Sequence, residues 1–409
     1  MKKIISYTII LIALSVNTVS AQIKILFDAT KAEAAANADW VIDADTHNLT
    51  YSNGPAQTGG DESNPQRYPV PTQSTVTSST PETYWEGGIS AWGIDMVKKG
   101  YEVETLPVGV QITYGNTGNA QDLSNYKVFV VVEPNIVFTS AEKIAILAFV
   151  QNGGGLFMVS DHDGSDRNND GWDSPHIWND FMDTTGTHPF GMHFNYDTFS
   201  QTTTNVANLP GNPLLHGVMG NVTEVQWSGG TSMTLSTTNN SSVKGVVYKT
   251  GSSTTGLTNA LVAYATYGNG RVVGFGDSSP CDDGTGDPND QLYTGWLVDA
   301  AGNHEKLIVN ATIWLAGSTS TIAEEPQLYN VLINQLTYPD KMVFDISSSD
   351  NIDHSTFSVY DLLGNQVSTM AVPDSKTVVI NNGSLSKGLY IYKLTVNGTV
   401  AKTGKFAML

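Results

Sequence analysis

The sequence predicts an α/β domain built on a doubly wound, mostly parallel sheet, followed by a small all-β sandwich. Two continuous apolar runs, at 127–132 and 156–160, have the composition of strands that are buried on both faces of a parallel sheet. A helix predicted at 139–152 separates them, and this alternation of strand and helix builds such sheets. Beyond residue 330 the pattern changes to short strands broken by Asn-Gly and Gly-Asn pairs, which is typical of a sandwich.

The elements of the first domain carry clear start and stop signals. Thr139 and Glu142 form a capping box, and Gly153 follows the end of that helix. Gly268 to Gly270 separate two apolar runs, which indicates a β-hairpin and an antiparallel edge of the sheet. The polar region 48–81 is typical of a long loop. We predict strands at 23–27, 101–105, 127–132, 156–160, 260–267 and 271–276, and helices at 84–99, 139–152 and 304–316.

The chain is expected to consist of four segments. Lys2 and Lys3, an apolar run at 4–16 and small residues before Gln22 are typical of a cleaved signal peptide. The alternative is a retained membrane anchor, but the run is shorter than the ~20 residues that span a bilayer. We predict a signal peptide at 1–21, the α/β core domain at 22–318, a linker at 319–329 and the sandwich at 330–409.

Charge is concentrated in the first domain. Residues 22–326 hold 12 basic and 33 acidic residues, whereas residues 327–409 hold six lysines and six aspartates. So acidic a domain repels phosphates, which argues against a nucleic-acid partner and favours cations or uncharged substrates. The single cysteine, Cys281, excludes an intramolecular disulfide. We interpret it as a packing residue rather than a nucleophile, because no base can be assigned to it.

Three stretches of the tail resemble the C-terminal sorting domain of type IX (Por-type) secretion. They are residues 357–364 (FSVYDLLG), 385–398 (LSKGLYIYKLTVNG) and 402–405 (KTGK), with Phe406 leading to the end. The resemblance implies an Ig-like β-sandwich that is read by the outer-membrane translocon, and a protein that is secreted or held at the outer cell surface. The alternative is an ordinary terminal Ig-like module that binds a ligand.

The first domain is similar to the class I glutamine-amidotransferase-like superfamily, in particular its gliding-protein-like and trehalose-utilisation-like branches. Residues 149–162 (FVQNGGGLFMVSDH) and 270–279 (GRVVGFGDSS) carry the resemblance. It implies a flavodoxin-like sheet. Where the family's triad needs a cysteine, this chain has Ser160-Asp161-His162. The Cys–His–Glu triad and glutaminase activity are therefore not expected.

Acidic residues directly follow four predicted strands, and these are the candidate site. Ligands of open α/β sheets bind beyond the carboxyl ends of the strands, so the carboxylates should share one rim. Such a cluster can hold a cation or do acid–base work. The alternative is that each one caps a neighbouring loop or helix. The strand-end acids are Asp28, Glu133, Asp161 and Asp277, and the predicted catalytic set is Asp28, Glu86, Asp161, His162 and Asp277.

A second candidate is a calcium loop. Asp166, Asn168, Asp170 and Gly171 match the opening of an EF-hand loop, in which oxygen side chains at alternate positions converge on the ion. The twelfth position is Ile177, which offers no carboxylate, so Asp173, Asn179 or Asp180 would have to substitute. A solvated Asn/Asp turn and a catalytic divalent metal are the alternatives. We predict calcium as the cofactor, with Asp166, Asn168, Asp170 and Asp173 as its ligands.

Two functions remain open at this point. The first is a secreted hydrolase that acts on an extracellular polymer such as a glycan, with Trp85 and Trp172 stacking on the ligand. The second is a non-catalytic, calcium-stabilised glycan-binding or surface protein. Convergence of the strand-end acids favours the enzyme, and dispersed acids that cap loops favour the binding protein. In either case we expect the type IX translocon as a partner, no nucleic acid, and no transmembrane segment in the mature chain.

Overall fold

A computed structural model describes the core between residues 22 and 317 and the tail between 331 and 408. The described residues are 22–35, 38–43, 47–48, 57–58, 70–85, 87–183, 188–284, 293–297, 301–317, 331–338, 341–348, 352–353, 355–361, 366–381, 383–396 and 399–408. The predicted signal peptide, the linker and Glu86 lie outside them. Described contacts divide the chain into two compact units, residues 1–207 with 221–317, and residues 208–220 with 318–409.

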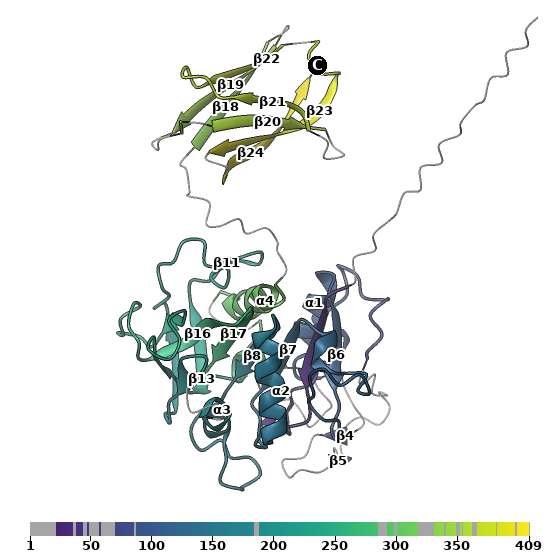
Figure 1. Ribbon diagram of the computed structural model, residues 1–409, viewed down its shortest axis with the longest axis vertical. Coiled ribbons are helices and arrows are strands. Elements are labelled where there is room, and N and C mark those ends of the chain that lie inside the picture. The colour runs from purple at the N-terminus through teal and green to yellow at the C-terminus, as the bar shows by residue number, and fades with distance from the viewer. Residues whose placement is uncertain are drawn as a thin grey trace, which may run out of the picture. The chain divides into compact units, whose positions relative to one another are not determined.

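The first unit is built on a nine-stranded mixed sheet, in the order β6-β1-β7-β8-β17-β16-β14-β9, with β15 also pairing β16 (Figure 1). Its parallel half and the β-hairpin were predicted, and both are confirmed. The parallel strands are β6 (Glu102–Leu106), β1 (Lys24–Asp28), β7 (Val128–Val132), β8 (Gly155–Val159) and β17 (Gly270–Phe275). The antiparallel strands are β16 (Ala260–Tyr267), β14 (Met233–Leu235), β9 (Met192–Phe194) and β15 (Lys244–Tyr248).

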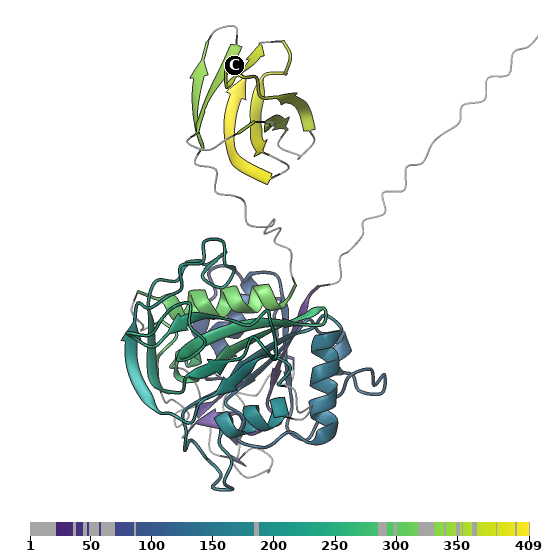
Figure 2. The ribbon, with the colours of Figure 1, turned by 60° about the vertical axis from the view of Figure 1, so that its left-hand side comes forward.

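Helices cover both faces of this sheet (Figure 2). The chain moves from β1 outward to β6 through α1 (Ser90–Lys98), and from β7 in the opposite direction to β8 through α2 (Ser140–Gln151). Right-handed crossovers in opposite directions place their helices on opposite faces. α4 (Asn303–Leu315) joins α1, and α3 (Ser174–Asp183) joins α2 through an ion pair of 2.6 Å between Lys143 and Asp180.

The core between α1, α4 and the sheet is centred on Trp92. Its ring packs edge-on against Phe27 of β1 and Phe157 of β8, at centroid distances of 5.4 and 5.0 Å. Its indole nitrogen donates to the Thr312 hydroxyl of α4 at 3.0 Å, so the buried N–H has a partner. One side chain thus joins two interior strands of the sheet and two helices.

The predicted helix at 84–99 begins later than expected. A short 3-10 helix, η1 (Glu82–Tyr84), precedes α1, which starts only at Ser90. Gly87 explains the delay, because a Cβ there would lie 2.0 Å from the carbonyl oxygen of Val41. The backbone must pass flat against residues 41–43 at this point and cannot coil there. The apolar periodicity that suggested one helix is therefore divided between two elements.

The remaining described elements before residue 317 are short. They are β2 (Ala34–Ala35), β3 (Ala38–Asp39), β4 (His47–Asn48), β5 (Gln57–Thr58), η2 (Leu123–Asn125), β10 (Phe199–Thr203), β11 (His216–Gly217), β12 (Gly220–Asn221), β13 (Val225–Gly230) and η3 (Ser279–Cys281). No helix in the described part of the chain is long and apolar enough to cross a membrane.

The second unit contains the predicted β-sandwich, which is confirmed. A three-stranded sheet β18-β19-β22 faces a four-stranded sheet β21-β20-β23-β24. Phe344 lies between them and contacts Phe357, Tyr392 and Phe406 at centroid distances of 4.8 to 5.3 Å. The strands are β18 (Val331–Thr337), β19 (Lys341–Ser348), β20 (Ser355–Tyr360), β21 (Gln366–Ala371), β22 (Thr377–Asn381), β23 (Gly388–Val396) and β24 (Thr399–Met408).

The sandwich has its own apolar core, so we expect the α/β domain to fold without it. A protein of residues 22–318 should be soluble and unfold cooperatively, at nearly the melting temperature of the core transition in the full-length protein. Thermal melts followed by circular dichroism measure this, with the full-length protein as the control. An insoluble fragment, or one without a cooperative transition, would contradict independent folding.

Candidate functional site

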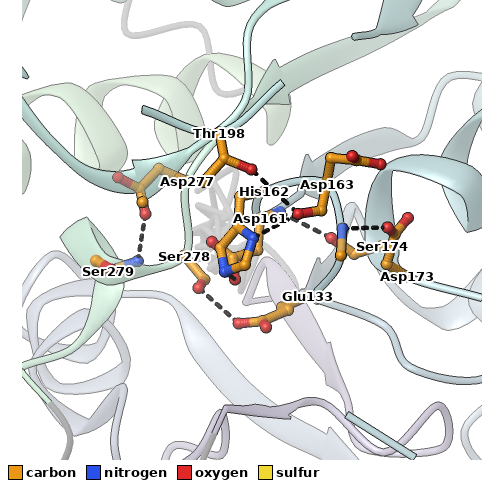
Figure 3. Close-up of polar contacts among 12 residues, drawn as sticks. Glu133, Asp161, His162, Asp163, Asp173, Ser174, Thr198, Asp277, Ser278 and Ser279 are labelled. Atoms are coloured by element: carbon orange, nitrogen blue, oxygen red, sulfur yellow. Dashed lines mark hydrogen bonds and ion pairs between the residues drawn. The ribbon is translucent and has the colours of Figure 1, made fainter. Parts of the chain in front are cut away.

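The parallel strands bring carboxylates to one edge of the sheet, as predicted. β7, β8 and β17 are adjacent and in parallel register, and each is followed within two residues by an acid. Glu133, Asp161 and Asp277 therefore converge at the carboxyl ends of three neighbouring strands (Figure 3). All three are buried, with exposed fractions of 3% or less.

Glu133 is the most constrained of the three. Its backbone has a positive φ of 48°, which is unfavourable for a glutamate and persists only where surrounding contacts hold it. One carboxylate oxygen accepts hydrogen bonds from the Trp40 indole at 3.0 Å and the Ser278 hydroxyl at 2.6 Å. The other faces Arg167. The hydrogen bonds from Trp40, Ser278 and Arg167 hold the Glu133 carboxylate in one position, so Glu133 forms the rigid base of the site.

Arg167 neutralises part of the cluster. Its guanidinium donates to Glu133 through Nε at 3.0 Å and Nη2 at 2.8 Å, and Nη2 also donates to Asp161 at 2.7 Å. A planar guanidinium suits this forked contact, which a lysine could not reproduce. One cation therefore serves two buried carboxylates, and a third, Asp277, lies nearby without an ion pair among the described residues.

Burial of this incompletely neutralised cluster favours the protonated acids. Desolvation, and then the charges of Glu133 and Asp277, raise the pKa of Asp161 well above its ordinary value. Desolvation also raises the pKa of Asp277 to about 7, although its oxygens accept backbone N–H groups of Ser228 at 2.5 Å and Ser279 at 2.9 Å. With a pKa of about 7, Asp277 can both give and take a proton near neutral pH, as general acid–base catalysis requires.

His162 forms the outer side of the site. Its Nε2 lies 3.7 Å from an Asp161 oxygen, and its Nδ1 lies 2.7 Å from the Asp163 carbonyl, to which it donates in one tautomer. The His162 side chain is about a quarter exposed, as is that of Arg167, whereas Asp161 is only 5% exposed. Solvent therefore reaches the buried acids past the imidazole and the guanidinium.

Asp28 follows β1 as expected, but it belongs to a different pair. It faces Glu33, and desolvation together with this neighbour raises the pKa of Glu33 well above its usual range. Burial also raises the pKa of Asp28. The Asp28 carboxylate accepts the amide of Thr30 at 3.1 Å, and no described contact links it to Asp161 or Asp277. The structure thus brings together Asp161, Asp277 and His162 of the predicted set, and leaves Asp28 beside them.

Neither Cys281 nor the serines have the features of an activated nucleophile. Burial, and then the charges of Asp277 and Asp282, raise the pKa of the Cys281 thiol well above its ordinary value, so the thiol stays protonated at neutral pH. Ser278 donates to Glu133, and Ser279 donates to the Ser228 carbonyl at 2.9 Å.

The acidic loop after β8 is closed by its own side chains. Asp166 accepts the backbone amides of Asp170 at 3.1 Å and Gly171 at 2.8 Å, and Asp170 accepts the amide of Trp172 at 2.9 Å. The Asn168 amide donates to Asp170 at 2.9 Å. Three of the four predicted calcium ligands therefore form a compact oxygen-rich turn at the surface.

Asp173, the fourth predicted ligand, points elsewhere. It is buried, and one oxygen accepts the Gly164 amide at 2.7 Å. The other accepts the His176 amide at 3.0 Å and contacts the His176 ring at 2.6 Å, so Asp173 caps the first turn of α3. Asp163, Asp173 and His176 each offer a ligand atom within 4.8 Å of the others. Asp173 thus joins the loop to the helix.

The two tryptophans predicted to bind a ligand differ in exposure. Trp85 is fully buried and packs against Gly93 of α1, so its faces are not open to a ligand. The hydrophobic environment of α1 explains this, because the indole fills the space that the missing side chain of Gly93 leaves. Trp172 is 37% exposed on the acidic loop and remains a candidate for stacking.

Sequence reasoning missed Arg167 as a site residue and named Glu133 only as a strand-end acid. A usable signal existed for the arginine, since it is the only arginine or lysine among the five aspartates between 161 and 173. A buried acidic cluster needs such a cation, and this was the nearest one available.

A surface pocket of about 320 Å³ lies away from this site, between α2 and residues 111–114. The one carboxylate that lines it, Glu142, is already used by Lys31 at 2.7 Å and by the capping box with Thr139. The carboxylate that lines this pocket is therefore already paired, and the candidate catalytic groups lie at the carboxyl ends of the strands instead.

Comparison with known proteins identifies the tail. Residues 338–408 match the model of the secretion system C-terminal sorting domain. This domain indicates export by type IX secretion to the cell surface or to the outside, and it makes the secretion machinery a partner of the chain. The expectation drawn from the three sequence stretches is confirmed. No curated protein is significantly similar to the chain.

Several solved structures are similar to the chain at low identity. The N-terminal domain of mmIFT52 is 13% identical in sequence, with a TM-score of 0.40. The match covers 71% of this chain and 97% of that domain. A cytoplasmic protein from Salmonella typhimurium has 15% identity and a TM-score of 0.35, with 56% and 88% covered. A putative ThuA-like protein from Parabacteroides merdae has 12% identity and a TM-score of 0.33, with 72% and 90% covered.

The raised pKa of Asp277 makes stability depend on pH. The unfolded chain loses this proton near its ordinary pKa of 3.8 and the folded chain only at about 7. Between these values the folded state binds more protons, so stability falls as pH rises, by up to about 1.4 kcal/mol per pH unit for this group. Asp277→Asn should reduce the slope of unfolding free energy against pH between pH 5 and 7.

Denaturant unfolding at several pH values measures that slope. The comparison uses the slope and not the absolute stability, because the asparagine also replaces one acceptor of a backbone amide with a donor. Glu224→Gln, at a partly exposed glutamate of the first unit, is the control and should leave the slope unchanged. An identical slope in Asp277→Asn and the parent protein would contradict the assignment.

Proposed function

We propose that the protein is an exported hydrolase that acts on an extracellular polymer such as a glycan, and that Asp161 and Asp277 provide its acid–base chemistry. The observation that carries this proposal is the convergence of three buried carboxylates at the carboxyl ends of adjacent parallel strands, two of which, Glu133 and Asp161, share the Arg167 guanidinium. Ligands of open α/β sheets bind at this edge. Perturbed acids with a specific charge partner in such a position are typical of catalytic sites.

The chemistry follows from the unequal environments of the acids. Glu133 is saturated by Trp40, Ser278 and Arg167, and it serves to hold the guanidinium. Burial raises the pKa of Asp161 and that of Asp277, and their mutual repulsion opposes ionisation of both. In a hydrolysis, the ionised member takes a proton from water while the protonated member gives its own to the leaving oxygen. The hydroxyl of water ends on the carbon that is attacked.

His162 and Arg167 are the groups that a substrate meets first. Both are about a quarter exposed, and both contact Asp161, at 3.7 and 2.7 Å. The imidazole can exchange protons with solvent and pass them to the buried carboxyl. The guanidinium can bind a developing negative charge on an oxygen of the substrate. Trp172, exposed on the neighbouring loop, supplies an apolar face for stacking.

Calcium is part of the proposal as a structural ion of the acidic loop. Asp166, Asn168 and Asp170 present oxygens at alternate positions, and Gly171 turns with a φ of 93°, which a residue with a side chain rarely adopts. An ion there would replace the weak contacts among these side chains and hold Arg167, which lies within the loop, against Glu133. The ion would thus support the site without entering the reaction.

The alternative function is a non-catalytic, calcium-stabilised surface protein that binds a glycan. It is favoured by the hydrogen bonds that Asp277 accepts from two backbone amides, since these are the contacts of a loop-capping carboxylate. In that case the site carboxylates would be structural, and the exposed Trp172 and Tyr196 would carry binding. Substitution of Asp161 separates the two functions.

Asp161→Asn should abolish most hydrolytic activity and preserve the fold. Asparagine keeps an oxygen for the Arg167 contact and nearly the same volume, but it cannot donate or accept the catalytic proton. General acid–base catalysis contributes about 10²–10⁴-fold, so a loss of that size is expected. Turnover on a panel of polysaccharides and esters measures it, beside Asp183→Asn as the control. Near-normal turnover in Asp161→Asn, with an unchanged melt, would place the chemistry elsewhere.

Calcium should raise the melting temperature of the protein through the acidic loop, because an ion that binds only the folded state stabilises it. The part of the shift that belongs to this loop should disappear in the Asp166→Ala, Asp170→Ala double variant and persist in Asp183→Ala. Thermal melts in millimolar calcium and in chelator measure the shift. An equal shift in the double variant and the parent protein would rule out calcium at this loop.

A further inference from the structure

A second group of carboxylates lies outside the site described above. Glu82 of η1, Asp95 of α1 and Glu305 of α4 each place one oxygen within 4.8 Å of the other two. Asp95 is buried, with 3% of its surface exposed, and Glu82 and Glu305 are half-buried. No described hydrogen bond or ion pair connects these three side chains to Glu133, Asp161 or Asp277. The cluster is therefore an independent feature of the α1–α4 face.

Asp95 is the residue that requires a ligand. Its Oδ2 is buried and accepts no hydrogen bond in the described structure, while its Oδ1 reaches only Lys99 Nζ, at 3.9 Å. This separation is too long for a hydrogen bond. A buried carboxylate oxygen without a partner is strongly unfavourable. The Glu305 carboxyl can donate a hydrogen bond to Asp95 only while it is protonated, so the ionised cluster leaves this oxygen without a donor.

The electrostatics of the cluster favour added positive charge. Desolvation, and then the charge of Asp95, raise the pKa of Glu305 to about 7 and shift the pKa of Glu82 upward. Lys98, the last residue of α1, and Lys99, which follows it, act on Glu82 through space, and Lys99 also forms a long ion pair with Asp95 at 3.9 Å. Three carboxylates thus share a site in which the described lysines make only this one long contact.

We propose that Glu82, Asp95 and Glu305 bind a hard divalent cation, calcium, with one carboxylate oxygen from each. The donor set contains only oxygen, which suits calcium and disfavours zinc, whose protein sites are mainly built from histidine and cysteine. The two glutamates are partly exposed, so water completes the six to eight ligands that calcium takes.

The bound ion would join three separate elements of the chain. η1 follows the long polar loop and is attached to α1 through the Ser90 hydroxyl, which donates to the Glu82 carbonyl at 2.8 Å. α4 is the last helix of the core domain and packs on α1 through Thr312 and Trp92. The cation would therefore stabilise this face of the domain, and the inference does not depend on the hydrolase proposal or on the loop around Asp166.

Calcium titration by isothermal calorimetry tests the site in the purified protein. Glu305→Gln should lose one bound calcium per chain, and Asp95→Asn should lose the same ion. The loss should be absent in Glu224→Gln, a matched change at another partly exposed glutamate. Added to the Asp166→Ala, Asp170→Ala variant, which lacks the loop site, Glu305→Gln should still remove one further calcium per chain. The metal-free Glu305→Gln protein should melt at the same or a higher temperature than the parent, because the substitution removes repulsion and not a bond.

Three outcomes would overturn the site. The parent protein could bind no calcium in the millimolar range, in which case a shared proton between Asp95 and Glu305 satisfies the pair. Glu305→Gln and Asp95→Asn could both retain the calcium stoichiometry and affinity of the parent. Finally, magnesium could bind in place of calcium with no calcium binding at the same residues, and this would assign a different cation to the cluster.

Discussion

The organisation of the core domain depends on the contact of one guanidinium with two buried carboxylates. Adjacent parallel strands cannot separate their ends, so Glu133 and Asp161 are held together by the backbone pairing of β7 and β8. A cation must then reach this edge, and Arg167 does so from the following loop. The turns at Asp166 and Asp170 fold the loop back toward the sheet, and Asp173 then starts α3. The path of the chain between β8 and α3 therefore serves charge compensation as much as packing.

The sequence predicted the parallel half of the sheet well and the antiparallel half poorly, for physical reasons. Strands buried on both faces, such as Val128–Val132, are continuous apolar runs, and such runs are readable. β9 and β14 have only three residues each, with one buried face, so they carry almost no periodic signal. The start of α1 was missed because it is set by the close approach of Gly87 to the backbone of Val41, a contact between residues distant in sequence.

The site was predictable in its location and less so in its members. Topology alone places the ends of β7, β8 and β17 together, and hence Asp161 with Asp277. Topology also suggested Asp28, but it could not indicate that Glu33, five residues later, would fold back onto it. Trp85 was predicted to stack on a ligand, yet its ring is buried in the space that Gly93 of α1 leaves. Which side chains contact each other is decided by the folded chain, as for Asp28 and Glu33, and leaves no pattern along the sequence.

The burial of Cys281 has a consequence for a protein that leaves the cytoplasm. Exported chains enter oxidising compartments, where an accessible thiol forms mixed disulfides or links two copies covalently. Here the single cysteine, Cys281, is buried at the end of η3, and burial together with the charges of Asp277, Asp282 and Glu133 opposes formation of the thiolate. The thiol of the folded protein is therefore unreactive in disulfide exchange, and it becomes reactive only when this region unfolds. The acids at the strand ends, whatever their part in turnover, also insulate the protein against redox damage.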